Sequence, residues 1–308
     1  MAEPRFKKLA LIGVGLIGSS IARAALRAGN VGHIAGCARR ESTRDACLRL
    51  GICHSVHEDP AEAVRDADLI IVCTHLGSYP QVAKDMSPGL KPGAIVSDVG
   101  SVKQMVFRDL GDHLPDEVHL VPAHPVSGTE KSGPEAGFAE LFDNRWCIVT
   151  PGPSADEEAV AQVHDFWTEL GSKVEKMDAR RHDLVLAITS HLPHLIAYNI
   201  VGTAEDLETV TEGDVIKYSA GGFRDFTRIA ASDPVFWRDV FLNNREAVLE
   251  MLGRFTEDLI ALQRAIRWRE GDQLEALFTR TRAVRQQIID AGQEIAATDF
   301  GRHPEKPD

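Results

Sequence analysis

The 308-residue sequence has few cysteines, and those it has are scattered. They stand at positions 37, 47, 53, 73 and 147, so their number is odd and no two form a Cys-x-x-Cys pair. This pattern argues against a disulfide framework and fits reduced thiols in a cytoplasmic protein. Cys53, His54 and His57 are residue types that bind metals, but the chain supplies no second ligand cluster, so no metal is expected there.

Basic charge is also scarce, with 34 Lys and Arg against 46 Asp and Glu and a net charge of −12. This balance argues against nucleic acid as the main partner, so any phosphate site must be built locally. No stretch is expected to reach the length of a membrane span, and no signal-peptide segment precedes the first apolar run. With 44% hydrophobic and 26% charged residues, the composition is that of a globular protein with one large or two moderate domains.

A glycine pattern follows the first apolar run, residues 9–12, and opens an amphipathic helical stretch. In this G-x-G-x-x-G pattern the first glycine permits a tight turn, the second lets the backbone approach a pyrophosphate, and the third lets helix and strand pack closely. The free N–H groups of the helix start would bind the phosphates. A turn that binds nothing is the alternative. The predicted cofactor contacts are Gly13, Gly15, Leu16, Ile17 and Gly18.

The second predicted strand, residues 33–38, ends where an NAD enzyme usually carries an acid for the ribose hydroxyl. Here the position is Ala38, so a 2′-phosphate meets no repulsion, and Arg39 offers it a two-pronged donor. A solvated basic surface is the alternative reading. NADP is the expected cofactor, with NAD possible. The predicted contacts at this end are Ala38, Arg39, Arg40, Ser42 and Thr43.

Strands and helices continue to alternate through the first half of the chain. Strands are predicted at 68–74, 94–98, 118–121, 146–150 and 173–177, and helices near 59–66, 79–86, from 101 onward and at 156–170. This order predicts an α/β fold with a doubly wound, mostly parallel sheet, whose ligands bind beyond the carboxyl ends of the strands. The residues expected to meet there are Cys73, Thr74, Val99, Gly100, Ser101 and His124.

His124 is the strongest candidate for a catalytic residue. It follows an apolar run and Pro122, and we expect it in a polar, Gly-rich turn, residues 124–132. Imidazole has an unperturbed pKa suited to proton abstraction near neutrality. A solvated surface histidine is the alternative. Convergence with the predicted cofactor edge favours a general base.

From residue 178 onward, long helical periodicity replaces the strands. We expect a helix at 183–203 that Pro193 kinks, one at 236–268, and a last one at 274–296. The expected domains are residues 1–178, residues 179–300, and a flexible tail at 301–308. The many apolar helix faces predict a core and part of a dimer interface.

Five segments occur in the order GVGLIGSS, DVGSVK, AHPVSGTEKSG, SHLPH and GGFRDFTRIAASDPVFWRD. With them, the chain resembles the TyrA family of prephenate and arogenate (cyclohexadienyl) dehydrogenases over about residues 9–300. The resemblance implies a Rossmann-type nucleotide-binding domain, then an all-helical domain through which two subunits pair. At 308 residues we expect neither the regulatory nor the mutase domain that some members carry.

The resemblance also implies a reaction, the NAD(P)-dependent oxidative decarboxylation of prephenate or arogenate to 4-hydroxyphenylpyruvate or tyrosine. It implies that His124 takes the proton of the substrate hydroxyl, that Ser101 orients this pair, and that Arg228 binds a substrate carboxylate. Glu130 would pair with Arg228 or gate the pocket, and Arg224 and Asp225 would reach the partner subunit's site. The further implied substrate contacts are His194, His191, Glu130, Thr129, Arg224, Asp225 and Trp237.

Several alternatives stay open at this stage. His191 and His194 could be zinc ligands or core histidines, Arg228 a structural ion-pair residue, and Trp237 a core residue. A hydroxyacid dehydrogenase of similar architecture would need a helix lysine, and Lys217 is the single candidate in the second half before the tail. A non-catalytic NADP sensor would not need His124. The choice between prephenate and arogenate, and feedback by tyrosine, are not determined by the sequence.

Overall fold

The computed structural model describes residues 3–129, 131–210 and 217–290. Its contacts divide the chain into two compact units, residues 1–249 and 250–308, which are taken separately below. The domain boundaries expected from the sequence, after residues 178 and 300, stay predictions.

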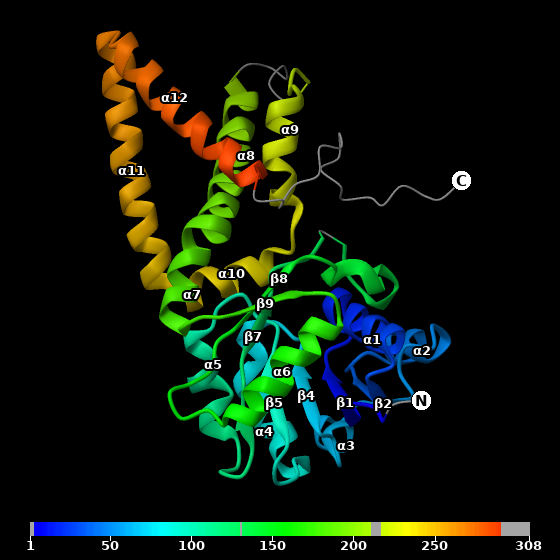
Figure 1. Ribbon diagram of the computed structural model, residues 1–308. Coiled ribbons are helices and arrows are strands. Elements are labelled where there is room, and N and C mark those ends of the chain that lie inside the picture. The colour runs from blue at the N-terminus through cyan, green and yellow to red at the C-terminus, as the bar shows by residue number, and fades with distance from the viewer. Residues whose placement is uncertain (1–2, 130, 211–216, 291–308) are drawn as a thin grey trace. The chain divides into compact units, whose positions relative to one another are not determined.

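The first unit is built on a six-stranded sheet in which every strand is parallel to its neighbours (Figure 1). The strand order β3-β2-β1-β4-β5-β6 reverses direction between β1 and β4, which is where dinucleotides bind in such sheets. The doubly wound, Rossmann-type fold expected from the sequence is therefore confirmed. The strands are β1 (Phe6–Ile12), β2 (Val31–Cys37), β3 (Ser55–His57), β4 (Leu69–Val72), β5 (Ile95–Asp98) and β6 (His119–Leu120).

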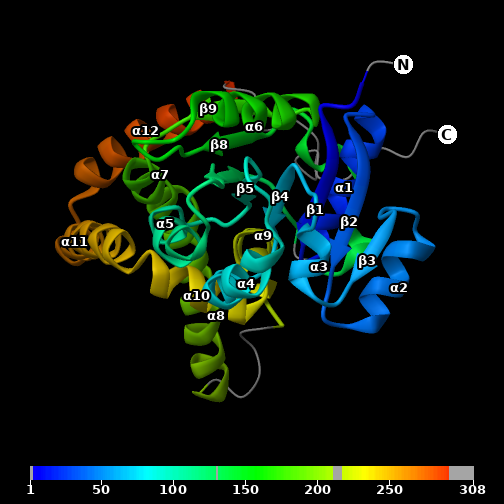
Figure 2. The same ribbon diagram turned by 90° about the horizontal axis from the view of Figure 1, so that it is seen from below.

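Helices cover both faces of this sheet (Figure 2). Successive residues of a strand point to opposite faces, so Leu9 and Leu11 of β1 enter one hydrophobic core while Ala10 and Ile12 enter the other. This two-sided burial explains why the central strands are continuous apolar runs. The first core also contains α1 (Leu16–Ala28), α2 (Glu41–Arg49) and α6 (Glu157–Glu169), and the second contains α3 (Pro60–Val64), α4 (Tyr79–Met86) and α5 (Gln104–Asp109).

A separate three-stranded sheet follows, made of β7 (Ala123–Pro125), β8 (Trp146–Val149) and β9 (Lys173–Lys176). The prediction of a polar turn at His124 is therefore wrong, because His124 lies on β7, antiparallel to β8, and is 8% exposed. The cause lies at Pro122. The N–H of Val121 still bonds to the carbonyl of Val96 at 2.9 Å, but proline has no N–H to continue the ladder. The chain then leaves the large sheet for the small one.

The first unit ends in helices: α7 (Ala179–Leu186), a π-helical turn (Ala187–His191), α8 (Leu192–Val210), α9 (Gly221–Thr227) and α10 (Pro234–Asn243). A π turn ends at His191, two residues before Pro193, and the kink expected at Pro193 stays a prediction. Single 3₁₀ turns lie at Leu76–Ser78, Ser87–Gly89, Gly111–His113, Pro134–Ala136, Ala139–Phe142 and Arg228–Ala231.

The continuous helix Ala179–Leu207 has 29 residues, and one 18-residue stretch of it has a mean hydropathy of 1.5, so by length and composition alone it could cross a membrane. The expectation that no stretch reaches that length is therefore wrong for this helix. One such helix is weak support for a membrane protein, because core helices pass the same test. Its buried residues His182, Asp183 and His191 take part in hydrogen bonds with other elements of the first unit, as expected of a helix packed within a globular fold.

The helix predicted at 236–268 is interrupted at Asn244, which separates α10 from α11 (Arg245–Trp268). Asn244 has φ −103° and ψ 31°, and its side chain donates to the carbonyl of Asp183 at 2.8 Å. Apolar spacing continues across this break, so periodicity alone did not reveal it. The second unit contains most of α11 and all of α12 (Gly271–Ile288), while residues 291–308 of the predicted last helix and tail lie outside the described residues.

Candidate active site

The glycine turn between β1 and α1 has the geometry that a bound dinucleotide requires. Gly13 has φ +94°, and its N–H bonds to the carbonyl of Cys37 at 2.9 Å. A Cβ on Gly18 would lie 2.3 Å from the carbonyl oxygen of Gly13, whereas a Cβ on Gly15 would meet nothing within 4 Å. The first helical N–H groups, from Leu16 and Ile17, have no side-chain cap and no acidic residue in the first turn. Open space and free donors therefore coincide where a pyrophosphate would bind.

Four of the residues expected at the carboxyl edge of the sheet lie there, just after β4 and β5. Cys73 and Thr74 directly follow β4, and Thr74 packs against Gly13. Val99 and Gly100 follow β5, and a Cβ on Gly100 would lie 2.9 Å from the hydroxyl of Tyr79. This edge is therefore closely packed and shaped before any ligand binds.

The adenosine end of the cofactor site is more open. Arg39 and Arg40 are exposed in the loop after β2. Arg44 holds that loop, since its guanidinium donates to the carbonyls of Ala38 at 2.8 Å and Arg39 at 2.9 Å. Ser42 is exposed and Thr43 half-buried in the first turn of α2. The five predicted contacts thus lie in the loop after β2 and in the first turn of α2.

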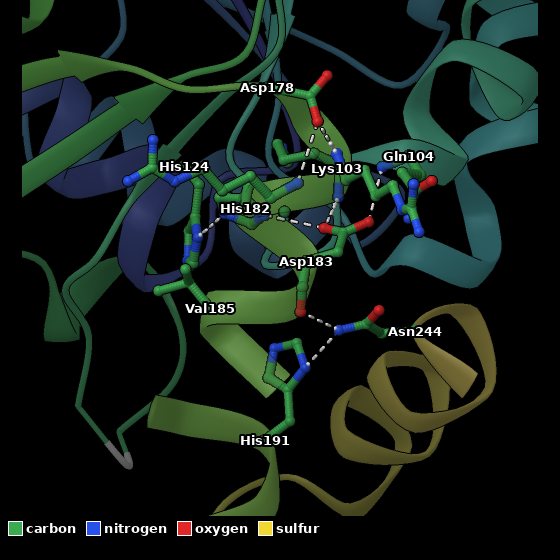
Figure 3. A network of polar contacts seen from close by, with 12 residues as sticks. Lys103, Gln104, His124, Asp178, His182, Asp183, Val185, His191 and Asn244 are labelled. Atoms are coloured by element: carbon green, nitrogen blue, oxygen red, sulfur yellow. Dashed lines mark hydrogen bonds and ion pairs between the residues drawn. The ribbon is translucent and has the colours of Figure 1, made fainter. Parts of the chain in front are cut away.

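His124 heads a buried chain of hydrogen bonds (Figure 3). Its Nδ1 lies 2.8 Å from Nε2 of His182, whose Nδ1 lies 2.9 Å from Oδ1 of Asp183. The same carboxylate accepts the backbone N–H groups of Lys103 at 2.7 Å and Gln104 at 2.9 Å. A carboxylate can only accept, so His182 carries its proton on Nδ1 and accepts on Nε2. His124 must then donate from Nδ1, which leaves Nε2 as a proton acceptor.

Burial keeps this chain in the required protonation state. It lowers the pKa of His124 well below the ordinary value, and His182, Lys103 and His191 lower it further. Burial also lowers the pKa of His182, although its bond to Asp183 opposes that shift. Burial would raise the pKa of Asp183, but bonds from His182 and two backbone N–H groups lower it. His124 is therefore neutral and able to accept a proton near pH 7.

Two polar atoms near His124 have no hydrogen-bond partner among the described residues: Oγ of Ser101 and Nε2 of His191. The amide of Asn244 donates to Nδ1 of His191 at 3.0 Å, so the proton of His191 lies on Nε2. Burial lowers the pKa of His191 to about 4. Buried polar atoms are rarely left unpaired. The hydroxyl of Ser101, together with the N–H of His191, whose weak interaction with the Ser101 backbone raises its pKa against the effect of burial, therefore fits a site for a polar ligand.

A second group of predicted substrate residues gathers on α8, α10 and the turn Arg228–Ala231. The ring of His194 stacks on that of Trp237, with centroids 3.6 Å apart, while Nδ1 of His194 donates to the carbonyl of Ser190 at 2.8 Å. Burial lowers the pKa of His194, and the nearby charge of Arg228 lowers it further. Trp237 is buried, as a core residue would be, and also supports His194.

The other predicted substrate residues are not part of the buried chain in the described part of the protein. Thr129 is exposed in the loop after β7, and Arg224 and Asp225 are exposed on α9. Glu130 lies outside the described residues.

His182, Asp183 and Asn244 were not among the site residues predicted from the sequence. Their signal was weak: polar residues on otherwise apolar helices, which become informative only once burial is known. Asp98 and Lys103 stood in a quoted segment but received no role, yet they form a fully buried ion pair at 2.6 Å.

The fold, the glycine turn and a buried neutral histidine on the small sheet that follows β6 define a nicotinamide-dependent dehydrogenase. No grouping of three or more His, Cys, Asp or Glu residues fit to hold a metal occurs within the described ranges. Family models described as the nucleotide-binding domain and the dimerization domain of prephenate dehydrogenase match residues 21–176 and 178–280. The chain belongs to the prephenate dehydrogenase family, as the sequence predicted.

Known relatives agree with this assignment. The cyclohexadienyl dehydrogenase of Zymomonas mobilis is 42% identical over 280 residues, which are 91% of this chain and 95% of that protein. The prephenate dehydrogenase of Bacillus subtilis is 32% identical over 87% of this chain and 71% of its own length. The crystal structure of A. aeolicus prephenate dehydrogenase with hydroxyphenyl propionate and NAD+ has a TM-score of 0.86 and 33% identity, covering 92% of this chain and 98% of that one.

Proposed function

We propose that this enzyme oxidatively decarboxylates a cyclohexadienyl substrate, prephenate or arogenate, in tyrosine biosynthesis. The observation that carries the proposal is the acceptor Nε2 of His124, fixed by His182 and Asp183 on the small sheet that follows the dinucleotide-binding sheet. The names of the relatives support the substrate class.

In the proposed reaction, Nε2 of His124 accepts the proton of the substrate hydroxyl while hydride leaves the carbon that bears it. The nicotinamide cofactor, when bound, takes up that hydride. Loss of carbon dioxide then completes an aromatic ring, so the protein mainly orients the substrate and receives the proton. Asp183 stabilises the imidazolium that forms, through His182. Ser101 and His191 offer the unpartnered hydroxyl and N–H to substrate oxygens, and Arg228 binds a carboxylate.

We further propose NADP as the preferred cofactor, with NAD also used. Ala38 at the end of β2 presents no carboxylate to the 2′-phosphate, and Arg39, Arg40, Ser42 and Thr43 offer charge and hydroxyls. The loop position fixed by Arg44 supports this assignment.

A cytoplasmic homodimer is the proposed state of the protein. A dimerization-domain model matches the helical half, and large apolar side chains are exposed in the second unit, including Ile260, Ile266 and Trp268. Such a surface is uncommon on a monomer. Light scattering should give the mass of two chains, and Ile260→Asp with Ile266→Asp should give one. A wild-type mass of one chain would contradict the dimer.

The test of the reaction is initial-rate absorbance of reduced nicotinamide, with prephenate and arogenate each paired with NAD and NADP. One pairing should turn over strongly. His124→Asn should lose roughly 10³-fold in kcat while still binding the cofactor. If all four wild-type pairings are silent while NADP binds, the reaction assignment fails and a nucleotide sensor or another hydroxyacid dehydrogenase takes its place.

A further inference from the structure

Lys103 is fully buried and contacts both the strand that carries His124 and the carboxylate at the end of the histidine chain. Its Nζ donates to both carboxylate oxygens of Asp98, at 2.7 and 2.6 Å, and to the carbonyl of Ala123 at 2.8 Å. Ala123 directly precedes His124 on β7. The backbone N–H of Lys103 bonds to Oδ1 of Asp183, the oxygen that also accepts from His182. One residue therefore contacts both the strand that carries the imidazole and the carboxylate that sets its tautomer.

Fold stability does not account for this ion pair. Removing two charges from water is costly, and apolar replacements of buried pairs are often neutral or stabilising. The carboxylate of Asp98 is instead fully bonded, since it also accepts from the hydroxyl of Tyr79 at 3.0 Å and the N–H of Gly100 at 2.8 Å. Asp98 thereby fixes the ammonium of Lys103 against the carbonyl of Ala123.

We propose that Lys103 is a positioning residue for the reaction: its ammonium holds the strand of His124 through the Ala123 carbonyl, beside the bond from its backbone N–H to Asp183. The proposal rests on the proposed function, in which His124 is the proton acceptor. The ammonium also adds positive charge beside His124, which disfavours the protonated imidazole and so leaves the acceptor form populated.

Other titratable groups around His124 also influence its pKa. His182 and His191 also disfavour its protonated form, while the Cys147 thiol on β8 stays neutral because burial raises its pKa. The groups that face His124 are His182 and Asp183 from α7, His191 from the π turn, Asp98 from the end of β5, Lys103 from the segment between β5 and α5, and Cys147 from β8. Among these, Lys103 supplies the positive charge: burial lowers its pKa, but the carboxylate of Asp98 opposes that shift and stabilises the ammonium.

The chain offers a matched control at the opposite edge of the sheet. Nζ of Lys91 donates to Oδ1 of Asp68 at 2.6 Å and to the carbonyl of Asp66 at 3.2 Å. This is again a lysine bonded to a carboxylate and a backbone carbonyl, but it stands before the starts of β4 and β5 and is partly exposed. Lys91→Met should leave kcat and its pH dependence unchanged.

The experiment compares kcat/KM against pH for the wild type, Lys103→Met, Lys103→Arg and Lys91→Met, with thermal unfolding of each. Lys103→Met should lose roughly 10²-fold in kcat, and the acidic limb should move about one unit to higher pH, because His124 then protonates more easily. Lys103→Arg keeps the charge but misplaces the donors, so kcat should fall while the limb stays in place.

A second variant keeps the test valid if Lys103→Met does not fold. In Lys103→Met with Asp98→Asn no charge is left unpaired, and the asparagine oxygen still accepts from Tyr79 and Gly100. This double variant should fold and have a reduced kcat. The proposal would be overturned if the double variant, or a folded Lys103→Met, had the wild-type kcat and an acidic limb at the wild-type pH. NMR titration of His124 tests the charge effect without substrate, so it separates failure of this inference from failure of the assigned reaction. An unchanged His124 pKa in Lys103→Met would count against it.

Discussion

The two ends of the predicted ligand site are built in opposite ways. At the catalytic end His124, His182 and Asp183 are buried and bonded to one another. At the adenosine end Arg39 and Arg40 are exposed on a loop. A buried, preorganised network acts on the reaction barrier, whereas exposed side chains in water contribute mostly to affinity. Changes at the first end should therefore lower kcat, and changes at the second should alter cofactor preference.

Asp183→Asn is expected to cause the largest loss of kcat. The carboxylate accepts from His182 and from the N–H groups of Lys103 and Gln104, but an amide cannot accept at both positions. If its NH2 faces His182, the tautomers of His182 and His124 reverse, and Nε2 of His124 carries a proton. We expect kcat to fall roughly 10³-fold, with cofactor affinity unchanged, by steady-state kinetics and cofactor titration.

Asp143→Asn is the control for that variant, because Asp143 pairs with Arg27 at the surface and should be neutral for kcat. A loss of less than about tenfold in Asp183→Asn would mean that the histidine chain does not set the base, and the contrast between the two ends would weaken.

Sequence alone predicted much of this fold and part of the site, for identifiable reasons. The apolar strands buried on two faces, the glycine turn and the residues just after β4 and β5 are local patterns, so they could be read in order. The partners of His124 could not, because His182 lies 58 residues away and Lys103 meets Asp183 across 80. The break at Asn244 also depends on a tertiary bond, whereas the end of the large sheet at Pro122 has a local cause in the missing N–H of proline. The contacts that the sequence did not predict lie almost wholly at the buried, catalytic end of the site.

Low pH should destabilise the folded protein through the buried histidines of the catalytic end. His191 is neutral in the folded protein with a pKa of about 4, against 6.5 for an unperturbed histidine. The unfolded chain therefore binds more protons below pH 6.5, so the stability is fully present above that pH and is lost as pH falls toward 4. The loss from His191 is about 3 kcal/mol, and His124 and His182 act in the same direction.

Urea unfolding at several pH values measures this loss. His191→Gln should flatten the pH dependence of the unfolding free energy, whereas Arg39→Ala at the exposed end should keep the wild-type slope. An unchanged slope in His191→Gln would show that this histidine is not held neutral by burial.

Arg228 is exposed, like the residues of the adenosine end, but lies close enough to His194 to lower the pKa of that histidine. Arg228→Ala therefore tests a residue intermediate between the two ends. Losing a charge-assisted bond to a substrate carboxylate should raise KM for the substrate roughly 10- to 100-fold, with a smaller effect on kcat. Arg254→Ala, which removes an exposed pair with Glu250, is the matched control and should change neither constant. Loss of kcat alone in Arg228→Ala would instead place this arginine with the buried, barrier-lowering group.

The smallest effect is expected at Arg39, and it tests the exposed end directly. Arg39→Ala removes the proposed donor to the 2′-phosphate, so the ratio of kcat/KM for NADP over NAD should fall roughly tenfold, while kcat with NAD is unchanged. Arg49→Ala, also on the surface of this region and paired with Glu135, should leave the ratio as in the wild type. If Arg39→Ala lowers kcat with both cofactors equally, the adenosine end also acts on the barrier, and the division of labour between the two ends fails.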